Sequence, residues 1–355
     1  MKVIITGICG FVGRLLAEAL VEAGTATVSG LDSLTRAGSE TNLHLLRKMG
    51  VRVTHGDIRL ASDVDALPDA DWIIDASANP SVVAGLKGGS ESRQLLEHNL
   101  IGTANILEKC RRSRAGLILV STSRVYSASA LASLEVRVKD DAFRPIFGKA
   151  SPGLSEHGID ESFPAEPPMS LYGATKRCSE ILALEYAEAC GIPVWIDRCG
   201  VLAGGGQFAL PEQGTFSYWI HGWRRKAPLQ YIGFDGKGHQ VRDCLHPRDL
   251  AALIIKQLAE REAGERPRIV NVSGGPASAR SLAQISAWCM KRFGGQPVGI
   301  APEPRPYDLP WIVLDNRLAA RTWEWSPSVK VAAILDEIAA HAEANPDWLE
   351  ITGGA

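Results

Sequence analysis

The chain opens with a short apolar run that leads directly into three regularly spaced glycines. Residues 2–5 have the composition of a strand, Gly7-Ile-Cys-Gly-Phe-Val-Gly13 follows, and residues 12–23 have the apolar spacing of a helix. Such glycines permit a tight turn, a close approach of backbone to a pyrophosphate, and close packing of helix on strand. The segment predicts a dinucleotide-binding unit. Because the spacing differs from G-x-G-x-x-G, a purely structural turn is the alternative.

Short apolar runs and helical stretches alternate through the first half of the chain. Strands are expected at 27–31, 51–55, 72–76, 117–121 and 193–198, and helices at 39–49, 92–112 and 170–189. This alternation is typical of a parallel sheet with helices on both faces. Beyond residue 198, loop formers and tryptophans become frequent, which predicts a smaller lobe, interrupted at 241–258 by a strand and helix returning to the first lobe.

We therefore expect an α/β fold with a Rossmann-type, doubly wound parallel sheet and a smaller, mixed C-terminal lobe. The cofactor-binding domain is expected over 1–198 plus about 241–262, and the substrate-binding lobe over about 199–240 plus 263–355. The segment 127–165 is longer than an ordinary connection, and such a length marks a functional lid or an insertion.

Composition limits the classes of protein to which the chain can belong. Its 355 residues are 45% apolar and 22% charged, with a net charge of −2, which is the balance of a soluble globular protein. Dispersed basic residues argue against nucleic acid or an anionic membrane as partner. The seven cysteines include no Cys-x-x-Cys pair and no cluster at metal-ligand spacing, so we expect reduced thiols, no metal and a cytoplasmic location.

Asp32 indicates which dinucleotide the first unit binds. It ends the second predicted strand, about 20 residues after the glycines, where a carboxylate binds the adenine ribose hydroxyls and repels a 2′-phosphate. NAD is therefore favoured over NADP. Arg36 lies nearby and would favour NADP if it bound the cofactor. The alternative is that Arg36 is a solvated loop residue. Asp57, after the third predicted strand, contacts the adenine or caps a helix.

Tyr172 and Lys176 lie four residues apart in Ser-Leu-Tyr-Gly-Ala-Thr-Lys and so share one helical face. A free tyrosine has a pKa of about 10 and is a poor base. The positive charge of Lys176, with that of an oxidised nicotinamide, is expected to lower that pKa. Thr122 follows an apolar run at the expected carboxyl edge of the sheet. It either donates a hydrogen bond to a substrate oxygen or merely caps the strand.

These residues together resemble the extended short-chain dehydrogenase/reductases, the NAD-dependent sugar-nucleotide epimerases and dehydratases. The resemblance rests on Thr6–Gly13, Asp32, Gly-Asp-Ile-Arg at 56–59, Asn99, Ser121–Tyr126, Tyr172–Lys176 and Gln-Val-Arg-Asp at 240–243. It implies Tyr172 as the base, Lys176 on the nicotinamide ribose and Thr122 on the reacting hydroxyl. The implied cofactor-binding residues are Gly7, Cys9, Gly10, Phe11, Val12, Gly13, Asp32, Arg36, Asp57, Ile58, Ala76, Ser77, Ala78, Asn99, Tyr172 and Lys176.

The resemblance also implies a nucleotide-diphosphate sugar, a CDP- or UDP-hexose, as the molecule bound by the second lobe. The implied substrate-binding residues are Thr122, Ser123, Arg124, Gln207, Phe208, Gln213, Arg242 and Arg305. Arg242 and Arg305 are expected to grip the pyrophosphate, because guanidinium groups bind such oxygens in pairs; surface ion pairs are the alternative. The aromatic residues between 208 and 223 are expected to form the pockets for the sugar and the nucleobase. The alternative is that they belong to the hydrophobic core.

Within this family the chain looks closest to the CDP-tyvelose (CDP-paratose) 2-epimerase branch. That match rests on the stretch 33–46, Gly-Gln-Phe at 206–208, Glu-Gln-Gly at 212–214 and Gln-Val-Arg-Asp-Cys-Leu-His at 240–246. Arg124 stands where the family's sugar dehydratases carry an acidic residue, so dehydration is disfavoured. Ser127 stands where the family usually has a glycine, and Gly206 stands where relatives often have a basic residue. Cys199 and Gly200 stand where relatives often have asparagines.

The sequence thus predicts a nucleotide-sugar epimerase that oxidises a ring carbon, C2 if the closest resemblance holds, and returns the hydride to the other face. A UDP-sugar 4-epimerase is the nearest rival, and a non-catalytic NAD-binding sensor is the alternative of another class. By analogy with relatives, we expect a homodimer formed through helices at 92–112 and 171–189.

Overall fold

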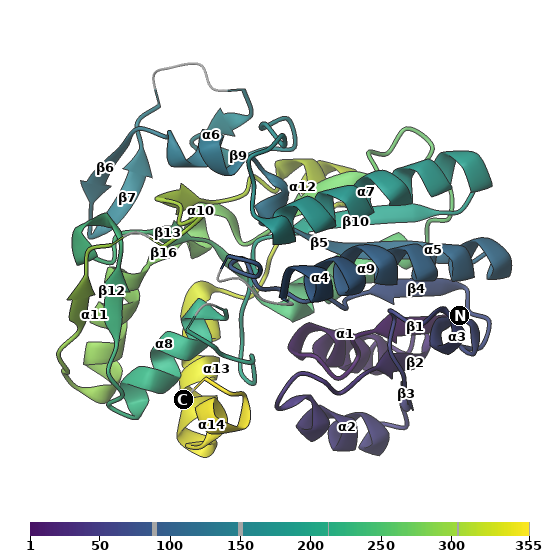
Figure 1. Cartoon of the computed structure of the whole chain (residues 1–355), viewed down its shortest axis with the longest axis horizontal. Coiled ribbons are helices and arrows are strands. Elements are labelled where there is room, and N and C mark those ends of the chain that lie inside the picture. The colour runs from purple at the N-terminus through teal and green to yellow at the C-terminus, as the bar shows by residue number, and fades with distance from the viewer. Residues whose placement is uncertain (87–90, 148–151, 212, 304, 355) are drawn as a thin grey trace.

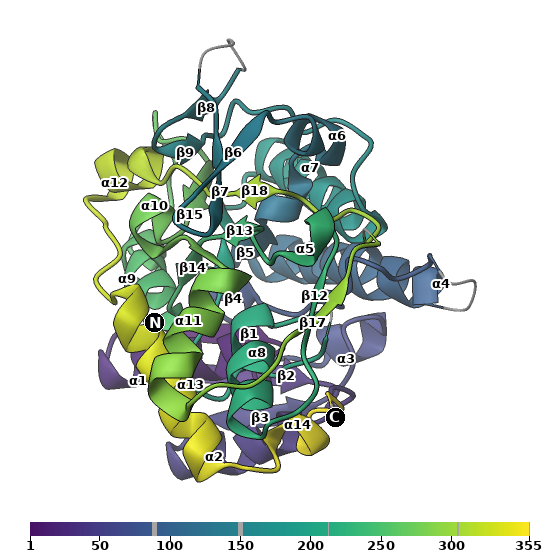
Figure 2. The same cartoon turned by 90° about the vertical axis from the view of Figure 1, so that its left-hand side faces the viewer.

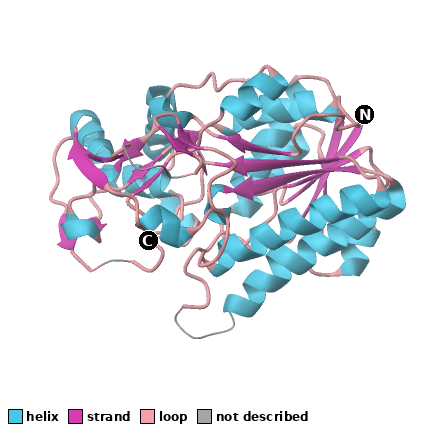
Figure 3. Cartoon of the chain, turned by 90° about the horizontal axis from the view of Figure 1, so that it is seen from above, coloured by secondary structure: helices cyan, strands magenta, loops and turns pink. Residues whose placement is uncertain are grey.

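The large sheet is parallel, as the sequence predicts, and it has seven strands. The computed structural model describes residues 1–355 except 87–90, 148–151, 212, 304 and 355. The strands fan across one half of the molecule (Figures 1 and 3). In spatial order they are β15 (Ile269–Val272), β10 (Val194–Cys199), β5 (Gly116–Thr122), β4 (Trp72–Asp75), β1 (Lys2–Thr6), β2 (Thr27–Asp32) and β3 (Arg52–His55). The strand order reverses between β1 and β4, which makes that position the topological switch point of the sheet.

Helices cover both faces of the sheet because its strands are apolar on both sides. Val3 and Ile5 face one helical layer, whereas Ile4 faces the other. The first layer contains α1 (Phe11–Glu22), α2 (Ser39–Lys48), α9 (Pro247–Leu258) and α12 (Arg317–Trp323). The second contains α3 (Ala61–Asp65), α5 (Gly102–Ser113) and α7 (Leu171–Cys190). No helix in the described part of the chain is long and apolar enough to cross a membrane.

The helix expected at 92–112 is interrupted rather than regular. It consists of α4 (Glu91–Leu96), a π-helical turn η1 (Glu97–Ile101) and α5. Asn99 lies in the π turn, fully buried. π turns inside helices are frequent at functional sites, and this one aims the Asn99 amide at the loop after β4.

The strand that returns to the large sheet was misplaced by the sequence prediction. β13 (Val241–Arg242) pairs with β16 (Arg280–Ser281) and β18 (Trp311–Ile312) in a small separate sheet, and α9 alone returns to the first lobe. The seventh strand is β15, beyond the expected boundary near 262. This strand, Ile-Val-Asn-Val, follows a polar loop and is too short to be recognised from its composition.

The second lobe, which faces the viewer in Figure 2, is built on its own apolar core. Trp219 and Trp223 of α8 (Thr215–Arg224) pack against Ile285 of α11 (Leu282–Phe293) and Ile338 of α13 (Val331–Ala344). The remaining elements are short: β11 (Val201–Leu202), β12 (Gln230–Ile232), η3 (Phe234–Gly236), β14 (Cys244–Leu245), α10 (Gly275–Ser278), β17 (Gly299–Ala301) and α14 (Trp348–Ile351). The strands pair as β11–β14 and β12–β17, and the separate sheet of β16, β13 and β18 has three strands, so the expected mixed lobe is confirmed.

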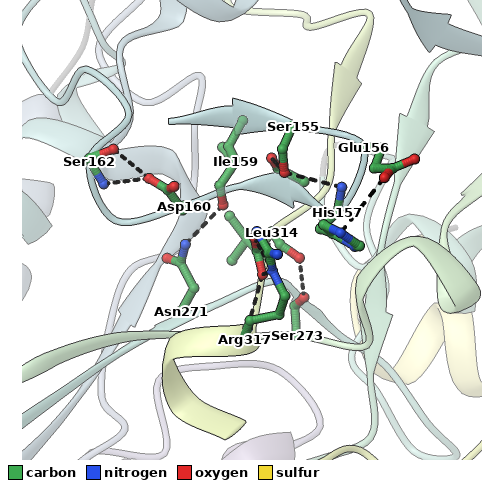
Figure 4. A network of polar contacts seen from close by, with 12 residues as sticks. Ser155, Glu156, His157, Ile159, Asp160, Ser162, Asn271, Ser273, Leu314 and Arg317 are labelled. Carbon is green, nitrogen blue, oxygen red and sulfur yellow. Dashed lines mark hydrogen bonds and ion pairs between the residues drawn. The ribbon is translucent and has the colours of Figure 1, made fainter. Parts of the chain in front are cut away.

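The segment 127–165 forms small elements that pack on the second lobe. They are η2 (Ser123–Val125) just before it, α6 (Ala128–Ala132), and the hairpins β6–β7 (Val136–Lys139, Ala142–Pro145) and β8–β9 (Leu154–Ser155, Gly158–Ile159). Figure 4 shows how the second hairpin is held: the amide of Asn271 donates to the carbonyl of Ile159 at 3.0 Å. None of its described residues lines the main cavity.

Candidate active site

A cavity of about 720 Å³ lies outside the carboxyl ends of the central strands, between the two lobes. It contains the switch point between β1 and β4, where ligands bind in open α/β sheets. Twenty of the predicted site residues line it: Gly7, Gly10, Phe11, Val12, Gly13, Asp32, Arg36, Asp57, Ile58, Ala76, Ser77, Ala78, Thr122, Ser123, Arg124, Tyr172, Gln207, Phe208, Gln213 and Arg242. The fold therefore brings the predicted cofactor and substrate residues to one continuous space.

The glycine turn leaves the start of α1 open to an anion. Gly7 has a φ of +68°, and a Cβ on Gly13 would lie 2.2 Å from the Gly7 carbonyl oxygen. Gly10 precedes the helix without a side-chain cap, and the N–H groups of Phe11 and Val12 have no hydrogen-bond acceptor within the described residues. Free N–H groups at a helix start suit a dinucleotide pyrophosphate.

Asp32 is held in place by backbone donors at the end of β2. Its carboxylate accepts hydrogen bonds from the N–H groups of Cys9 and Leu34, each at 2.8 Å. Burial raises the pKa of Asp32 above its usual value, while these backbone bonds oppose that rise. Cys9 itself is buried behind the cavity and contributes through its backbone. Arg36 is engaged elsewhere, because its Nη1 donates to Gln213 Oε1 at 2.8 Å.

Of two further predicted cofactor-binding residues, Asp57 lines the cavity and Asn99 lies behind it. Asp57 lines the cavity, but its carboxylate is paired with Arg59, whose Nη2 lies 2.6 Å away. Asn99 does not line the cavity. Its Oδ1 accepts from the Asn79 N–H at 2.8 Å and its Nδ2 donates to Thr175 Oγ1 at 3.1 Å. Asn99 therefore ties the loop after β4 to α7 rather than facing the cavity.

Tyr172 lies in the first turn of α7, which begins at the side-chain cap Ser170. Burial raises the pKa of Tyr172, whereas a hydrogen bond with Thr122 and the charge of Arg124 lower it. The Thr122 hydroxyl accepts the N–H of Arg124 at 3.2 Å, so its own proton remains available to Tyr172 or to a bound hydroxyl. The phenol and the hydroxyl thus form a proton-transfer pair.

Lys176 is almost fully buried one turn further along α7. Burial lowers its pKa, and the charges of Asp75 and Glu180 oppose that effect. Its ammonium forms no hydrogen bond within the described residues. Lys176 is not among the residues that line the cavity, but a buried ammonium without a hydrogen-bond acceptor suits the ribose hydroxyls of a dinucleotide.

The effect of Lys176 on the pKa of Tyr172 stays a prediction. Helical spacing places the two side chains on one face of α7. It does not reveal the charges of Asp75 and Glu180, which oppose the effect of burial on the pKa of Lys176.

On the side of the second lobe, Arg242 faces the cavity from β13. Its Nη1 donates to the carbonyls of Val241 and Leu309, and its Nη2 lies 3.3 Å from Asp308 Oδ1. Gln207 and Phe208 line the same space. Arg305 does not: its Nη1 donates to the carbonyl of Pro211 at 3.1 Å outside the cavity, so the expected arginine pair is not brought together. Glu212 of the predicted motif lies outside the described residues.

The cavity is also lined by residues that the sequence prediction did not include. They include Ser33, Ser39, Arg59 and Asn79 of the first lobe and Thr215 and Ile312 of the second. Ser33 and Arg59 directly follow the predicted site residues Asp32 and Ile58, and this adjacency was the only sign in the sequence that they would line the cavity. Thr215 and Ile312 come from segments whose approach depends on the tertiary fold.

A buried polar network supports the catalytic residues from behind. Glu180 accepts from Ser121 Oγ at 2.6 Å and from Arg198 Nη2 at 2.8 Å. Arg198 also contacts the Tyr126 hydroxyl at 3.3 Å, and that hydroxyl donates to Asn271 at 2.7 Å. The network joins α7, β10, β5 and β15, which holds Thr122 and Tyr172 in a fixed relation.

Comparison with known proteins shows the family of the chain. Residues 3–273 match the model of the NAD dependent epimerase/dehydratase family. The chain is 30% identical to CDP-paratose 2-epimerase of Salmonella typhi, over 93% of this chain and 95% of that one. It is 28% identical to dTDP-glucose 4,6-dehydratase of Mycolicibacterium smegmatis, over 74% of this chain and 70% of that one.

Solved structures share the fold along almost the whole chain. UDP-glucuronic acid 4-epimerase from Bacillus cereus, in complex with UDP-glucuronic acid and NAD, superposes with a TM-score of 0.77 at 22% identity, over 97% of this chain and 99% of that one. UDP-glucose 4-epimerase of Thermus thermophilus, in complex with NAD, gives 0.76 at 24% identity over the same shares. The chain belongs to the NAD dependent epimerase/dehydratase family, and both the resemblance seen in its sequence and NAD as its cofactor are confirmed.

Proposed function

We propose that this protein is an NAD-dependent epimerase of a nucleotide-diphosphate sugar and that it inverts C2 of a CDP-linked hexose. The observation that carries the proposal is the single cavity in which Tyr172 and Thr122 of the first lobe meet Gln207, Phe208 and Arg242 of the second. The 30% identity with CDP-paratose 2-epimerase over nearly the full length supports the choice of base and carbon.

Each residue has a defined part in this reaction. When bound, NAD supplies the hydride acceptor and donor for the sugar carbon. Tyr172 takes the hydroxyl proton as the ketone forms and returns it after the opposite face is reduced. Thr122 donates a hydrogen bond to the reacting oxygen, and Lys176 holds the nicotinamide ribose through its buried ammonium. Asp32 binds the adenine ribose, and the N-terminus of α1 binds the cofactor pyrophosphate.

The substrate is assigned to the wall formed by the second lobe. Arg242, half-buried and fixed by two backbone carbonyls, offers its remaining N–H groups to the substrate pyrophosphate. Gln207 and Phe208 border the position of the sugar. Dehydration is disfavoured, because Arg124 occupies the place where the resemblance puts the acid of a dehydratase, and a guanidinium does not release a proton at neutral pH.

The direct test is incubation of the purified protein with CDP-paratose or CDP-tyvelose without added cofactor, followed by NMR of the products. We expect both directions to reach the same mixture, and we expect Tyr172→Phe to lose nearly all activity while keeping its NAD. A strict need for stoichiometric NADH would overturn the proposal and indicate a reductase. Full activity of Tyr172→Phe would instead favour a non-catalytic NAD-binding protein.

A UDP-sugar 4-epimerase is the second candidate, because solved structures of UDP-sugar 4-epimerases share the fold over 97% of the chain. Parallel incubations of CDP- and UDP-hexoses in deuterated water separate the two by nucleobase and by inverted centre. Direct hydride return leaves no deuterium on the inverted carbon in either case.

We also propose that two copies associate through α7 and the α4–η1–α5 helix. Leu96, Ile101, Leu171 and Ile181 are apolar side chains on these helices that remain between 42% and 49% exposed. Sedimentation of the wild-type chain against Ile101→Glu tests this surface, and an unchanged monomer in both would exclude it.

A further inference from the structure

A second cavity lies on the β6–β7 hairpin, at the upper left of Figure 1. Its volume is about 420 Å³, which is within the range of sites that hold a small organic ligand. None of its lining residues lines the main cavity. The lining includes Arg137, Lys139, Asp140, Arg144, Ile146 and Phe147. Three of these side chains are basic and one is acidic, so positive charge dominates the cavity.

The hairpin is held in one position by its turn. Asp140 and Asp141 join the two strands with φ values of +52° and +56°, as in a two-residue hairpin turn. Both carbonyls of the turn accept hydrogen bonds from the start of α11. Gln284 Nε2 donates to the carbonyl of Asp140 at 2.7 Å, and Ser281 Oγ donates to that of Asp141 at 2.6 Å. Such a turn fixes the register of the two strands.

This register places Arg137 of β6 directly opposite Arg144 of β7. Side chains opposite each other in an antiparallel pair share one face of the sheet, and like charges there destabilise the pair. Lys139, two residues after Arg137, lies on the same face. Within the described residues, none of the three basic side chains has a hydrogen bond or an ion pair. Their positive charge is therefore concentrated at a fixed place without a compensating partner.

An exposed apolar surface borders this charge. Ile146 and Phe147 follow β7 directly, and each is 50% exposed. A guanidinium binds a phosphate through paired N–H groups, and two opposed arginines offer two such pairs. An exposed aromatic ring offers a face on which a nucleobase stacks. The cavity thus combines the two kinds of contact that a nucleotide makes.

We propose that the β6–β7 hairpin carries a second ligand site, which binds a nucleoside phosphate. Arg137 and Arg144 bind the phosphate group, Lys139 adds a third positive charge, and the base stacks on Phe147. A bound phosphate would also relieve the repulsion between the two arginines. The site lies outside the cavity of the proposed reaction, so its ligand is a molecule other than the one that reacts.

The experiment is calorimetric titration of the protein with ADP in the presence of excess NAD. The wild type is compared with Arg137→Gln/Arg144→Gln. Hydrogen bonds to charged groups contribute about 1.5–3 kcal/mol, so we expect ADP affinity to fall about tenfold or more in this variant. The matched control is Lys48→Gln/Arg52→Gln, which removes two exposed basic residues of the first lobe and the same net charge. The control should bind ADP as the wild type does.

Two further measurements locate the ligand and test its chemistry. Photolabelling with 8-azido-ADP, followed by peptide mapping, is expected to mark residues 136–147 in the wild type and not in the double arginine variant. Phe147→Ala should lower the affinity for ADP and leave that for inorganic pyrophosphate unchanged, because only ADP carries a ring.

Thermal melting without ligand tests the opposed arginine pair itself. Arg144→Gln should raise the melting temperature at low salt, and added salt should reduce the difference, because salt screens the repulsion between exposed charges. Since this variant gains stability, its loss of ADP binding would not reflect a damaged fold.

An unchanged ADP affinity in Arg137→Gln/Arg144→Gln, or an equal loss in the control, overturns the inference. Photolabel confined to other segments also overturns it. Equal binding of ADP and pyrophosphate would overturn the assignment of a nucleotide. None of these measurements depends on epimerisation, so a failure here is distinguishable from a failure of the proposed function.

Discussion

Arg198 of β10 and Glu180 of α7 form a buried ion pair directly behind the candidate catalytic residues. Arg198 Nη2 lies 2.8 Å from Glu180 Oε2, and neither side chain is more than 4% exposed. The same carboxylate accepts from Ser121 Oγ at 2.6 Å, next to Thr122. The pair therefore fixes α7 against β5 and β10, which sets the distance between Tyr172 and Thr122.

Arg198→Met is expected to destabilise the protein strongly, because it leaves Glu180 buried without its partner. Breaking a buried pair from one side costs about 3–5 kcal/mol. Urea denaturation measures the change in the free energy of unfolding. The control is Arg225→Met, which removes an exposed pair with Glu350 and should change that free energy by less than about 1 kcal/mol. A similar effect of both variants would contradict the prediction.

Asp32→Ala is expected to weaken NAD binding and to relax discrimination against NADP. Hydrogen bonds to a charged group contribute about 1.5–3 kcal/mol, so NAD affinity should fall about tenfold or more. Calorimetric titration with NAD and NADP of protein stripped of cofactor measures both affinities. Asp71→Ala, just before β4 at the opposite end of the sheet, is the matched control. Unchanged selectivity in Asp32→Ala would show that the carboxylate does not face the ribose.

Arg36 and Gln213 connect the two lobes at the edge of the cavity. Their side chains meet at 2.8 Å, and the Arg36 guanidinium lies 6.0 Å from the ring centre of Phe208. We expect Arg36→Ala and Gln213→Ala each to speed NAD release, with no further gain in the double variant, because both remove one contact. Stopped-flow fluorescence of cofactor release measures the rates. Fully additive effects would show that the two side chains act independently.

Asp197 is expected to make stability depend on pH near neutrality. Its Oδ1 accepts from Gln257 at 2.8 Å, its Oδ2 has no partner within the described residues, and burial raises its pKa from 3.8 to about 7. A raised carboxyl pKa gives stability that is present at low pH and lost as pH rises from the unfolded pKa through 7. Asp197→Asn should therefore gain on the order of 1 kcal/mol or more over the wild type at pH 8, and less at pH 5.

Urea denaturation of both proteins at pH 5 and pH 8 measures this difference. Comparison within each pH removes the contribution of all other titrating groups. An Asp197→Asn advantage of equal size at both pH values would mean that the carboxyl group does not titrate in this range.

The parts of the fold that were predictable rest on local rules. The glycines at 7, 10 and 13 require a tight turn before a helix, and the structure places that turn after β1 and opens α1 there. Tyr172 and Lys176 share a face because helical spacing requires it, whatever surrounds them. The strands β1, β4, β5 and β10 of the large sheet were recognisable by their apolar character, since both faces of each are buried.

The differences between prediction and structure concern relations between segments far apart in the chain. Arg305 lies in a motif that resembles a substrate-binding one, whereas its Nη1 donates to the carbonyl of Pro211. The strand that begins at Val241 belongs to a small sheet, and β15 forms the edge of the large sheet. The local sequence pattern does not identify these partners, because strand pairing depends on segments far away in the chain.

The order of residues by itself determined the dinucleotide turn, the tyrosine–lysine helix, the parallel sheet and the family, since each depends on spacing along one segment. Only the tertiary structure decided which groups act on Lys176 and Arg124. The charges of Asp75 and Glu180 act on Lys176, whereas the Arg124 guanidinium donates to the neutral carbonyl of Tyr307. Electrostatic effects fall with distance through space and depend on burial, and neither the distance nor the burial can be read from the sequence.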